Sequence, residues 1–169
     1  MKRSLVIGFG SIGQRHVKIL RELGLSVYIY SRRIHPEEEN FPNLKSALSK
    51  INPEYVVIAN ETSEHFSTLK TVLSFKIPII LVEKPLFSFL KSIPKNFNSE
   101  IRVGYNLRFH PLLKMLHSEI KQQSIISVQG YVGQFLPNWR IQNDYSISYS
   151  VSSLHGGGAL RDLSHELDF

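Results

Sequence analysis

The sequence predicts an α/β protein built on a doubly wound parallel sheet. Short runs of branched apolar residues, typical of buried parallel strands, alternate with helical segments as far as about residue 105. The first such run leads directly into a glycine-rich turn at residues 8–13. The pattern changes from about residue 111, and a strand that we predict at 124–131 could open a smaller α+β domain. We therefore predict domains at 1–121 and 122–169.

Composition excludes several classes of protein. The 169 residues include no cysteine, which rules out a disulfide scaffold, thiolate metal sites and cysteine catalysis, and which suits a reducing, cytoplasmic location. No apolar run approaches the ~20 residues of a membrane helix, so we expect no membrane partner. The net charge of +6 is dispersed over both halves of the chain. That dispersion favours a phosphorylated small ligand, or a charge that serves solubility alone, over a nucleic-acid partner.

The first 30 residues predict a strand–helix–strand unit. Residues 4–7 and 26–30 have the composition of buried strands. Between them, apolar residues recur at helical spacing, and Gly24 stands where a helix-ending glycine is expected. A strand, a glycine loop, a helix and a second strand within ~30 residues form the Rossmann-type unit that binds dinucleotides.

The spacing of the loop glycines has a chemical reason. Gly8 allows a tight turn out of the strand, Gly10 lets a pyrophosphate approach the backbone, and Gly13 lets the helix pack closely on the strand. The first N–H groups of the helix would face the phosphates. A purely structural glycine turn is the alternative. The cofactor contacts predicted in this loop are Gly8, Phe9, Gly10, Ser11, Ile12 and Gly13.

The end of the second strand indicates which dinucleotide binds. NAD-binding units usually place an acidic residue there to accept a hydrogen bond from the ribose 2′-OH. This strand is followed instead by Ser31, Arg32 and Arg33. Guanidinium groups suit a 2′-phosphate, so we predict NADP, with NAD as the alternative. The other interpretation is that both arginines are merely solvated loop charges.

Strands and helices continue to alternate along the chain. We predict strands at 55–59, 79–82 and 101–105, a helix at 63–75, and a helix at 44–49 that Asn43 caps. Ligands of doubly wound sheets bind beyond the carboxyl ends of the strands. The polar residues predicted at these ends are Asn60, Glu61, Glu83, Lys84 and Asn106.

The last third of the sequence is less regular. We predict a helix at 111–121, a strand at 124–131, and an irregular loop at 134–154 that holds Trp139. A lone strand has an open edge, which would promote self-association. A helical stretch at 159–169 would carry Asp162, His165 and Asp168 on neighbouring parts of one face.

Three motifs in this order resemble the Gfo/Idh/MocA oxidoreductases, the relatives of glucose–fructose oxidoreductase and inositol dehydrogenase. They are GFGSIGQRH at 8–16, EKPL at 83–86 and GGGALRDLSHELD at 156–168. The segment LPNWR at 136–140 resembles a branch found with surface-glycan biosynthesis genes. The resemblance implies hydride transfer between a nicotinamide cofactor and a sugar or sugar-nucleotide carbinol or ketone.

The resemblance also implies roles for individual residues. Lys84 would hydrogen-bond the reacting oxygen, and the peptide bond to Pro85 is often cis in this family. His165 would be the general base, and Asp162 would orient it or bind a substrate hydroxyl. Asn60 and His65 would lie beside the nicotinamide, although His65 and His16 also suit structural roles. Further cofactor contacts are Glu61, Glu83 and Lys84. The substrate contacts implied are Lys84, Asn106, Arg108, Trp139, Asp162 and His165.

Departures from the family pattern keep a second hypothesis open. Family members continue through several more strands, so residues 122–169 would be the truncated start of a substrate domain that usually also forms the oligomer interface. We expect a homo-oligomer and no metal site, because the histidines and carboxylates lack a recognised ligand spacing. The alternative to an active enzyme is a non-catalytic nucleotide-binding remnant.

Overall fold

A computed structural model describes residues 2–93, 98–121, 123–133, 135, 138 and 157–168. The chain divides into two compact units, Met1–Gly104 and Tyr105–Phe169. The division between these units falls before the helix at 111–120, whereas we placed the domain boundary after it. The domain assignment therefore stays a prediction.

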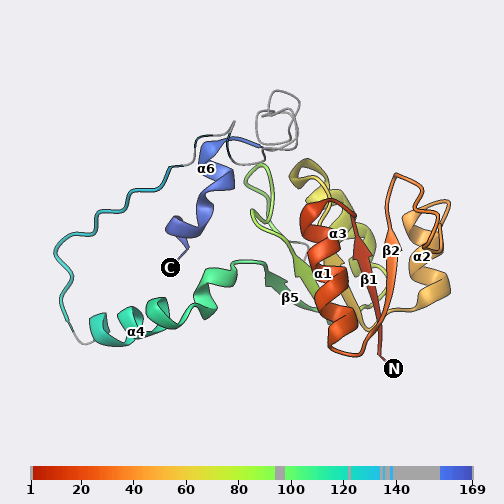
Figure 1. The fold of residues 1–169 in the computed structure, drawn as a ribbon, viewed down its shortest axis with the longest axis horizontal. Coiled ribbons are helices and arrows are strands. Elements are labelled where there is room, and N and C mark those ends of the chain that lie inside the picture. Colours follow the sequence, from red (N-terminus) through yellow and green to blue (C-terminus); the bar gives the residue numbers. More distant parts are fainter. Residues whose placement is uncertain are drawn as a thin grey trace. The chain divides into compact units, whose positions relative to one another are not determined.

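The first unit contains a five-stranded sheet in which every neighbouring pair is parallel. The strand order is β2-β1-β3-β4-β5. The chain therefore adds β2 on one side of β1 and then adds β3, β4 and β5 on the other side (Figure 1). This order confirms the predicted doubly wound sheet. The strands are β1 (Arg3–Ile7), β2 (Ser26–Tyr30), β3 (Tyr55–Ile58), β4 (Ile79–Val82) and β5 (Glu100–Val103).

Helices cover both faces of this sheet. Leu5 and Ile7 of β1 pack in one buried cluster with residues of α2 and α3, while Val6 packs in a second cluster with residues of α1. Successive strand residues point to opposite faces, so one apolar run supplies two cores. The helical segments of this unit are α1 (Ser11–Glu22), α2 (Leu44–Ile51), the 3-10 turn η1 (Thr62–Glu64) and α3 (His65–Leu73).

Two helix ends are formed as the sequence predicts. Gly24, just after α1, has φ +78°, a conformation that glycine adopts without strain. The side chain of Asn43 accepts a hydrogen bond from the N–H of Ser46 at 2.9 Å, which caps α2.

The second unit contains short helical segments in its described part. The predicted helix near 111–121 is confirmed as α4, and its apolar side chains Leu112, Met115 and Leu116 are at least half exposed. The described segments are η2 (Asn106–Phe109), α4 (Pro111–Ile120), α6 (Ala159–Asp162) and η5 (Ser164–Leu167).

The predicted strand at 124–131 is wrong. Residues 123–133 are exposed and have no regular secondary structure. A strand is stable only when its N–H and C=O groups pair with a neighbour, and no described residue pairs with this segment. Self-association through an open strand edge at 124–131 is therefore not supported, because these residues form no strand.

The predicted continuous helix at 159–169 is also wrong. The four-residue helix α6 ends at Asp162, because the next residue, Leu163, has a φ of −103° and a ψ of 35° that are not helical. The 3-10 turn η5 follows. A single helical turn fixes many dihedral angles for few hydrogen bonds, so it does not propagate without packing support. Asp162, His165 and Asp168 consequently do not share one face of one helix.

Candidate functional site

The glycine loop connects the carboxyl end of β1 to α1, and two of its glycines are required by close backbone approaches. Gly8 has φ +96°, and a Cβ there would lie 2.6 Å from backbone atoms of Ala59 and Asn60. A Cβ on Gly13 would lie 2.1 Å from the carbonyl oxygen of Gly8. Both distances are far inside van der Waals contact, so the loop lies directly against the end of β3.

Gly10 differs from these glycines because a Cβ there would meet no described atom within 4 Å. Gly10, Ser11 and Ile12 are exposed, and Gly10 is the N-cap of α1. A glycine cap has no side chain to bond the first N–H groups of the helix, so these donors face outward. The loop therefore presents backbone donors beside open space.

The segment after β2 folds onto this loop. The ring of His35 contacts the ring of Phe9 edge-on, with centroids 4.6 Å apart. Ser31 Oγ accepts a hydrogen bond from the N–H of Arg33 at 3.2 Å and lies 3.3 Å from His35 Nε2. Ser31 is half-buried, and Arg33 is exposed.

Arg32, in the same segment, is paired with a carboxylate. Its Nη2 lies 2.7 Å from Oε2 of Glu64 in η1. This hydrogen bond, and then the charge of Glu64, raise the pKa of the Arg32 guanidinium above its ordinary value. Arg32 is therefore held at the edge of the sheet by a residue that follows β3.

Glu83 stands at the carboxyl end of β4 and is bound on two sides. Its Oε1 lies 2.6 Å from Nε2 of His16 on α1, and its Oε2 accepts the N–H of Lys84 at 3.3 Å. A Cβ on Gly104 would lie 3.1 Å from the Glu83 carboxylate, so the glycine leaves room for that group. This network holds the backbone of Lys84, whose peptide bond to Pro85 is cis, as the family resemblance implies.

His65, at the start of α3, is only 1% exposed. Its Nδ1 lies 3.1 Å and 3.2 Å from the carbonyl oxygens of Pro85 and Leu86, and its Nε2 lies 3.1 Å from that of Asn60. Burial lowers the pKa of His65, and the three carbonyl contacts act in the opposite direction. The imidazole thus ties the turn after Lys84 to the end of β3, which favours the structural role among those considered for it.

Asn60 follows β3, and only one of the two polar atoms of its side chain has a hydrogen-bond partner among the described residues. Its Nδ2 donates to Thr68 Oγ1 at 2.9 Å, whereas its buried Oδ1 has no hydrogen-bond partner among the described residues. A buried acceptor without a partner is costly, and such atoms are commonly satisfied by a ligand or by water. Glu61, next in the chain, is half-buried.

The second unit places some predicted residues but not others. Arg108 donates two hydrogen bonds of 2.6 Å to the carboxylate of Asp168, and this carboxylate raises the pKa of Arg108. The ring of His165 contacts that of Tyr105, with centroids 5.6 Å apart. Asn106 is exposed in η2. Trp139 and the side chain of Asp162 lie outside the described residues.

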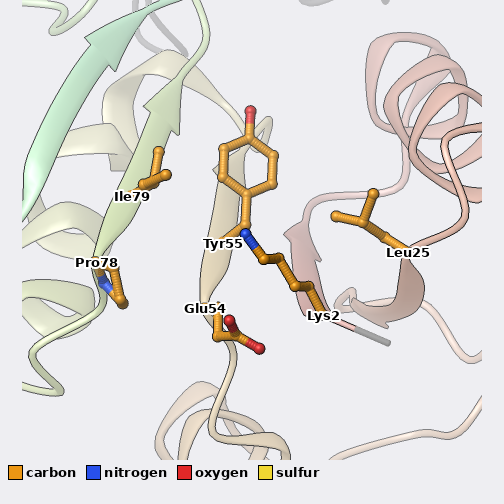
Figure 2. A pocket seen from close by; sticks show the side chains of 6 residues that line it. All are labelled: Lys2, Leu25, Glu54, Tyr55, Pro78 and Ile79. Carbon is orange, nitrogen blue, oxygen red and sulfur yellow. The ribbon is translucent and has the colours of Figure 1, made fainter.

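A cavity of about 240 Å³ lies at the opposite end of the strands, where β1 to β4 begin. Figure 2 shows that its lining comes from the starts of β3 and β4 and from residues just before the strands. Burial raises the pKa of Tyr55, which lines this cavity. The amino ends of parallel strands are not where such sheets bind ligands. The lining residues are Lys2, Leu25, Glu54, Tyr55, Pro78 and Ile79.

No helix in the described part of the chain is long and apolar enough to cross a membrane. Among the same residues, no three histidine or acidic side chains gather as metal ligands would.

The family assignment follows from residues 2–102. They match the GFO_IDH_MocA family model, described as an oxidoreductase family with an NAD-binding Rossmann fold. The chain belongs to this family. No curated protein matches the chain.

Solved structures share the fold of this chain. The WlbA (WbpB) dehydrogenase from Thermus thermophilus, solved with NAD and UDP-GlcNAcA, is 22% identical with a TM-score of 0.76 and covers 99% of this chain and 61% of its own. An NAD-binding protein from Listeria innocua is 19% identical, with a TM-score of 0.68, covering 99% of this chain and 53% of its own. UDP-N-acetylglucosamine 3-dehydrogenase GnnA from Acidithiobacillus ferrooxidans is 20% identical, with a TM-score of 0.59, covering 69% and 41%. This chain thus spans less than two thirds of each.

The described residues of the glycine loop and of the neighbouring strand end fit a dinucleotide. Gly10 leaves open space beside the first N–H groups of α1, which is the arrangement that accepts a pyrophosphate. The unpartnered Oδ1 of Asn60 adds an acceptor at the neighbouring strand end. The loop and Asn60 would hold the cofactor, and the individual contacts stay predictions.

Sequence reasoning missed the partners that hold the predicted residues. Glu64, which binds Arg32, and Gly104, which leaves room for Glu83, carry no motif of their own. Both are far in sequence from their partners. Only the order of the strands brings them together, so no local signal could have identified them.

Proposed function

We propose that this chain is an NAD(P)-dependent oxidoreductase that transfers a hydride between the nicotinamide and a carbinol or ketone carbon of a sugar or sugar nucleotide. One observation carries the proposal. Lys84 follows β4, and only β3 lies between β4 and β1, the strand that leads into the glycine loop. The carboxylate of Glu83 accepts the backbone N–H of Lys84. The UDP-GlcNAcA bound to WlbA and the identity of GnnA as a UDP-N-acetylglucosamine 3-dehydrogenase support the substrate class. The resemblance of the segment at 136–140 supports a role in surface-glycan biosynthesis.

The roles of the chain's own residues follow from their chemistry. The cofactor, when bound, supplies or accepts the hydride. The Lys84 ammonium would donate a hydrogen bond to the reacting oxygen and stabilise the charge that develops there. Glu83, paired with His16, and His65, bound to the carbonyls of Pro85 and Leu86, would keep Lys84 oriented.

The second unit would supply the proton chemistry. We propose His165 as the general base for the substrate hydroxyl and Asp162 as the carboxylate that orients it, as the family resemblance implies. Imidazole suits this task because its pKa lies near neutral pH. Asn106, Arg108 and Trp139 are proposed substrate contacts.

The cofactor is proposed to be NADP in preference to NAD. The segment after β2 offers Ser31, Arg32 and Arg33, and it carries no acidic residue at the position where NAD-binding units have one. Replacing both arginines by alanine should weaken NADPH binding ten-fold or more and leave NADH binding nearly unchanged. An equal loss for the two cofactors would contradict the 2′-phosphate role.

The first experiment is a titration of the purified chain with NADPH and NADH, followed by nicotinamide fluorescence and by thermal shift. Selective NADPH binding is the expected result. Oxidation of UDP-linked N-acetylhexosamines and hexuronates would then be screened in the unmodified chain, in Lys84→Met, and in Lys45→Met as a control. Lys45 is exposed in α2, so its substitution should be silent. Turnover that Lys84→Met retains would contradict the proposed role of Lys84.

A non-catalytic nucleotide-binding remnant is the second candidate. It is favoured by the absence of a strand at 124–133 and by the break between α6 and η5, which separates Asp162 from His165. Such a protein would bind the dinucleotide and oxidise no sugar. Binding without turnover across the substrate screen would therefore select this candidate.

We further propose a cytoplasmic homo-oligomer without a metal site. The apolar side chains of α4, exposed by 64% at Leu112, 58% at Met115 and 50% at Leu116, support association because monomers rarely leave such a face uncovered. Sedimentation of the purified chain tests the association, and a monomer at all concentrations would contradict the proposed homo-oligomer.

A further inference from the structure

The ion pair between Arg32 and Glu64 joins two segments on either side of the glycine loop. Arg32 follows β2, and Glu64 lies in η1, which follows β3. In the sheet, β1 lies between these two strands, and its carboxyl end opens into the glycine loop. The pair, 2.7 Å from Nη2 to Oε2, therefore connects the two neighbours of the strand end where the dinucleotide is proposed to bind.

The environment of Arg32 is acidic. Glu64 supports the charged guanidinium by a hydrogen bond and by its charge, and Glu61 adds a smaller contribution to the raised pKa of Arg32. Arg32 is 63% exposed and Glu64 is 45% exposed, so a ligand can reach both groups. A guanidinium has five donors in a planar fork, and Nη2, which contacts the Glu64 carboxylate, is one of the donors that would hold a phosphate.

We infer that Glu64 is a specificity-determining residue whose carboxylate competes with the 2′-phosphate of NADP for the guanidinium of Arg32. The inference rests on the proposed cofactor function. The preference for NADP over NAD is then smaller than Arg32 and Arg33 alone would give, because Arg32 is already bound to Glu64. Glu64 itself touches no reacting atom.

The two cofactors differ at this point by one charged group. The ribose 2′-OH of NAD is neutral, so NAD leaves the pair of Arg32 and Glu64 intact. The 2′-phosphate of NADP must draw the guanidinium away from Glu64 and also brings its negative charge toward Glu64 and Glu61. Removing the Glu64 charge should therefore help NADPH and have little effect on NADH.

The side chain of Glu64 can be changed without disturbing its backbone. The N–H of Glu64 donates to the carbonyl oxygen of Glu61 at 2.8 Å, and its own carbonyl oxygen accepts the hydroxyl of Ser67 at 2.9 Å. Neither bond uses the carboxylate. Glu64→Gln keeps the shape of the side chain and removes its charge. Glu64→Ala removes the charge without introducing a side-chain amide that could form hydrogen bonds of its own.

The test is a titration of the full chain with NADPH and with NADH at low ionic strength, where exposed charges are least screened. The variants are Glu64→Gln, Glu64→Ala, Arg32→Ala and the double variant Arg32→Ala/Glu64→Gln. Glu100→Gln is the matched control, because Glu100 pairs with Arg102 at 2.7 Å, at similar exposures of 55% and 64%, on the edge strand β5. Thermal unfolding of each variant checks that it is folded.

We expect Glu64→Gln and Glu64→Ala to bind NADPH about three- to ten-fold more tightly, with NADH changed less than two-fold and Glu100→Gln unchanged for both. The gain should be clearly smaller when Arg32 is already alanine. An unchanged or weaker affinity for NADPH, or an equal gain in the Arg32→Ala background, would overturn the competition. If the unmodified chain binds neither cofactor, the proposed function fails first; if it binds NADPH and Glu64 has no effect, only this inference fails.

Discussion

His16 Nε2 lies 2.6 Å from Oε1 of Glu83, so helix α1 is tied directly to the end of β4. The two side chains are only 19% and 14% exposed. The other carboxylate oxygen of Glu83 accepts the N–H of Lys84. One carboxylate therefore connects the helix of the glycine loop to the proposed catalytic lysine.

Replacing His16 by alanine should reduce the free energy of unfolding by about 1–3 kcal/mol, because the mostly buried carboxylate of Glu83 loses its partner. Urea denaturation of the unmodified chain and of His16→Ala measures this difference in the free energy of unfolding. Lys18→Ala is the control on the same helix, since Lys18 and Glu22 form an exposed contact of 3.9 Å. Equal losses in the two variants would show that the pair of His16 and Glu83 contributes no more than a surface contact.

Gly10→Ala should separate cofactor binding from stability. The new Cβ meets no described atom within 4 Å, so the thermal midpoint should change little. The same methyl group would occupy the space that we assign to the pyrophosphate, and both NADPH and NADH should bind at least ten-fold more weakly.

The measurements are thermal unfolding without ligand and fluorescence titration with each cofactor. Gly130→Ala is the matched control, because Gly130 is exposed and its Cβ would also meet nothing within 4 Å. Undiminished binding by Gly10→Ala would mean that no phosphate lies beside Gly10.

His65 should make the stability of the protein depend on pH. Burial lowers the folded-state pKa of His65 below its ordinary value of 6.5, so the unfolded chain takes up the proton first as the pH falls. Protonation therefore favours the unfolded state. The part of the unfolding free energy that depends on His65 is complete above about pH 7 and declines as the pH falls below about 6.5.

The check is urea denaturation between pH 7.5 and pH 5 for the unmodified chain and for His65→Gln. The variant should be less stable at pH 7.5 and should lose less stability on acidification. His117→Gln is the control, since His117 is exposed on α4. A variant with the same pH dependence as the unmodified chain would refute the assignment.

Much of the first unit was predictable because its signals are local. The strand at 4–7, the glycine turn, the end of α1 at Gly24 and the Asn43 cap are each written within a few residues. A buried parallel strand requires a continuous apolar run, and a left-handed turn favours glycine, so sequence and conformation correspond directly.

The second unit was harder to predict for a physical reason. The segment at 124–131 has the composition of a strand, but a strand exists only when another strand pairs with it. The stretch at 159–168 has helical spacing, but a short helix depends on packing for its continuity. Composition specifies a preference, and tertiary partners decide whether it is realised.

The sequence by itself determined the βαβ unit, the position of the glycine loop and the residues that follow each strand. Only the tertiary structure decided which of those residues meet. Glu83 is held by His16, Arg32 by Glu64, and the turn after Lys84 by His65. These partners are distant in sequence, and the strand order brings them together. A side chain's charge is visible in the sequence, but whether it is available to a ligand depends on the neighbour that already binds it.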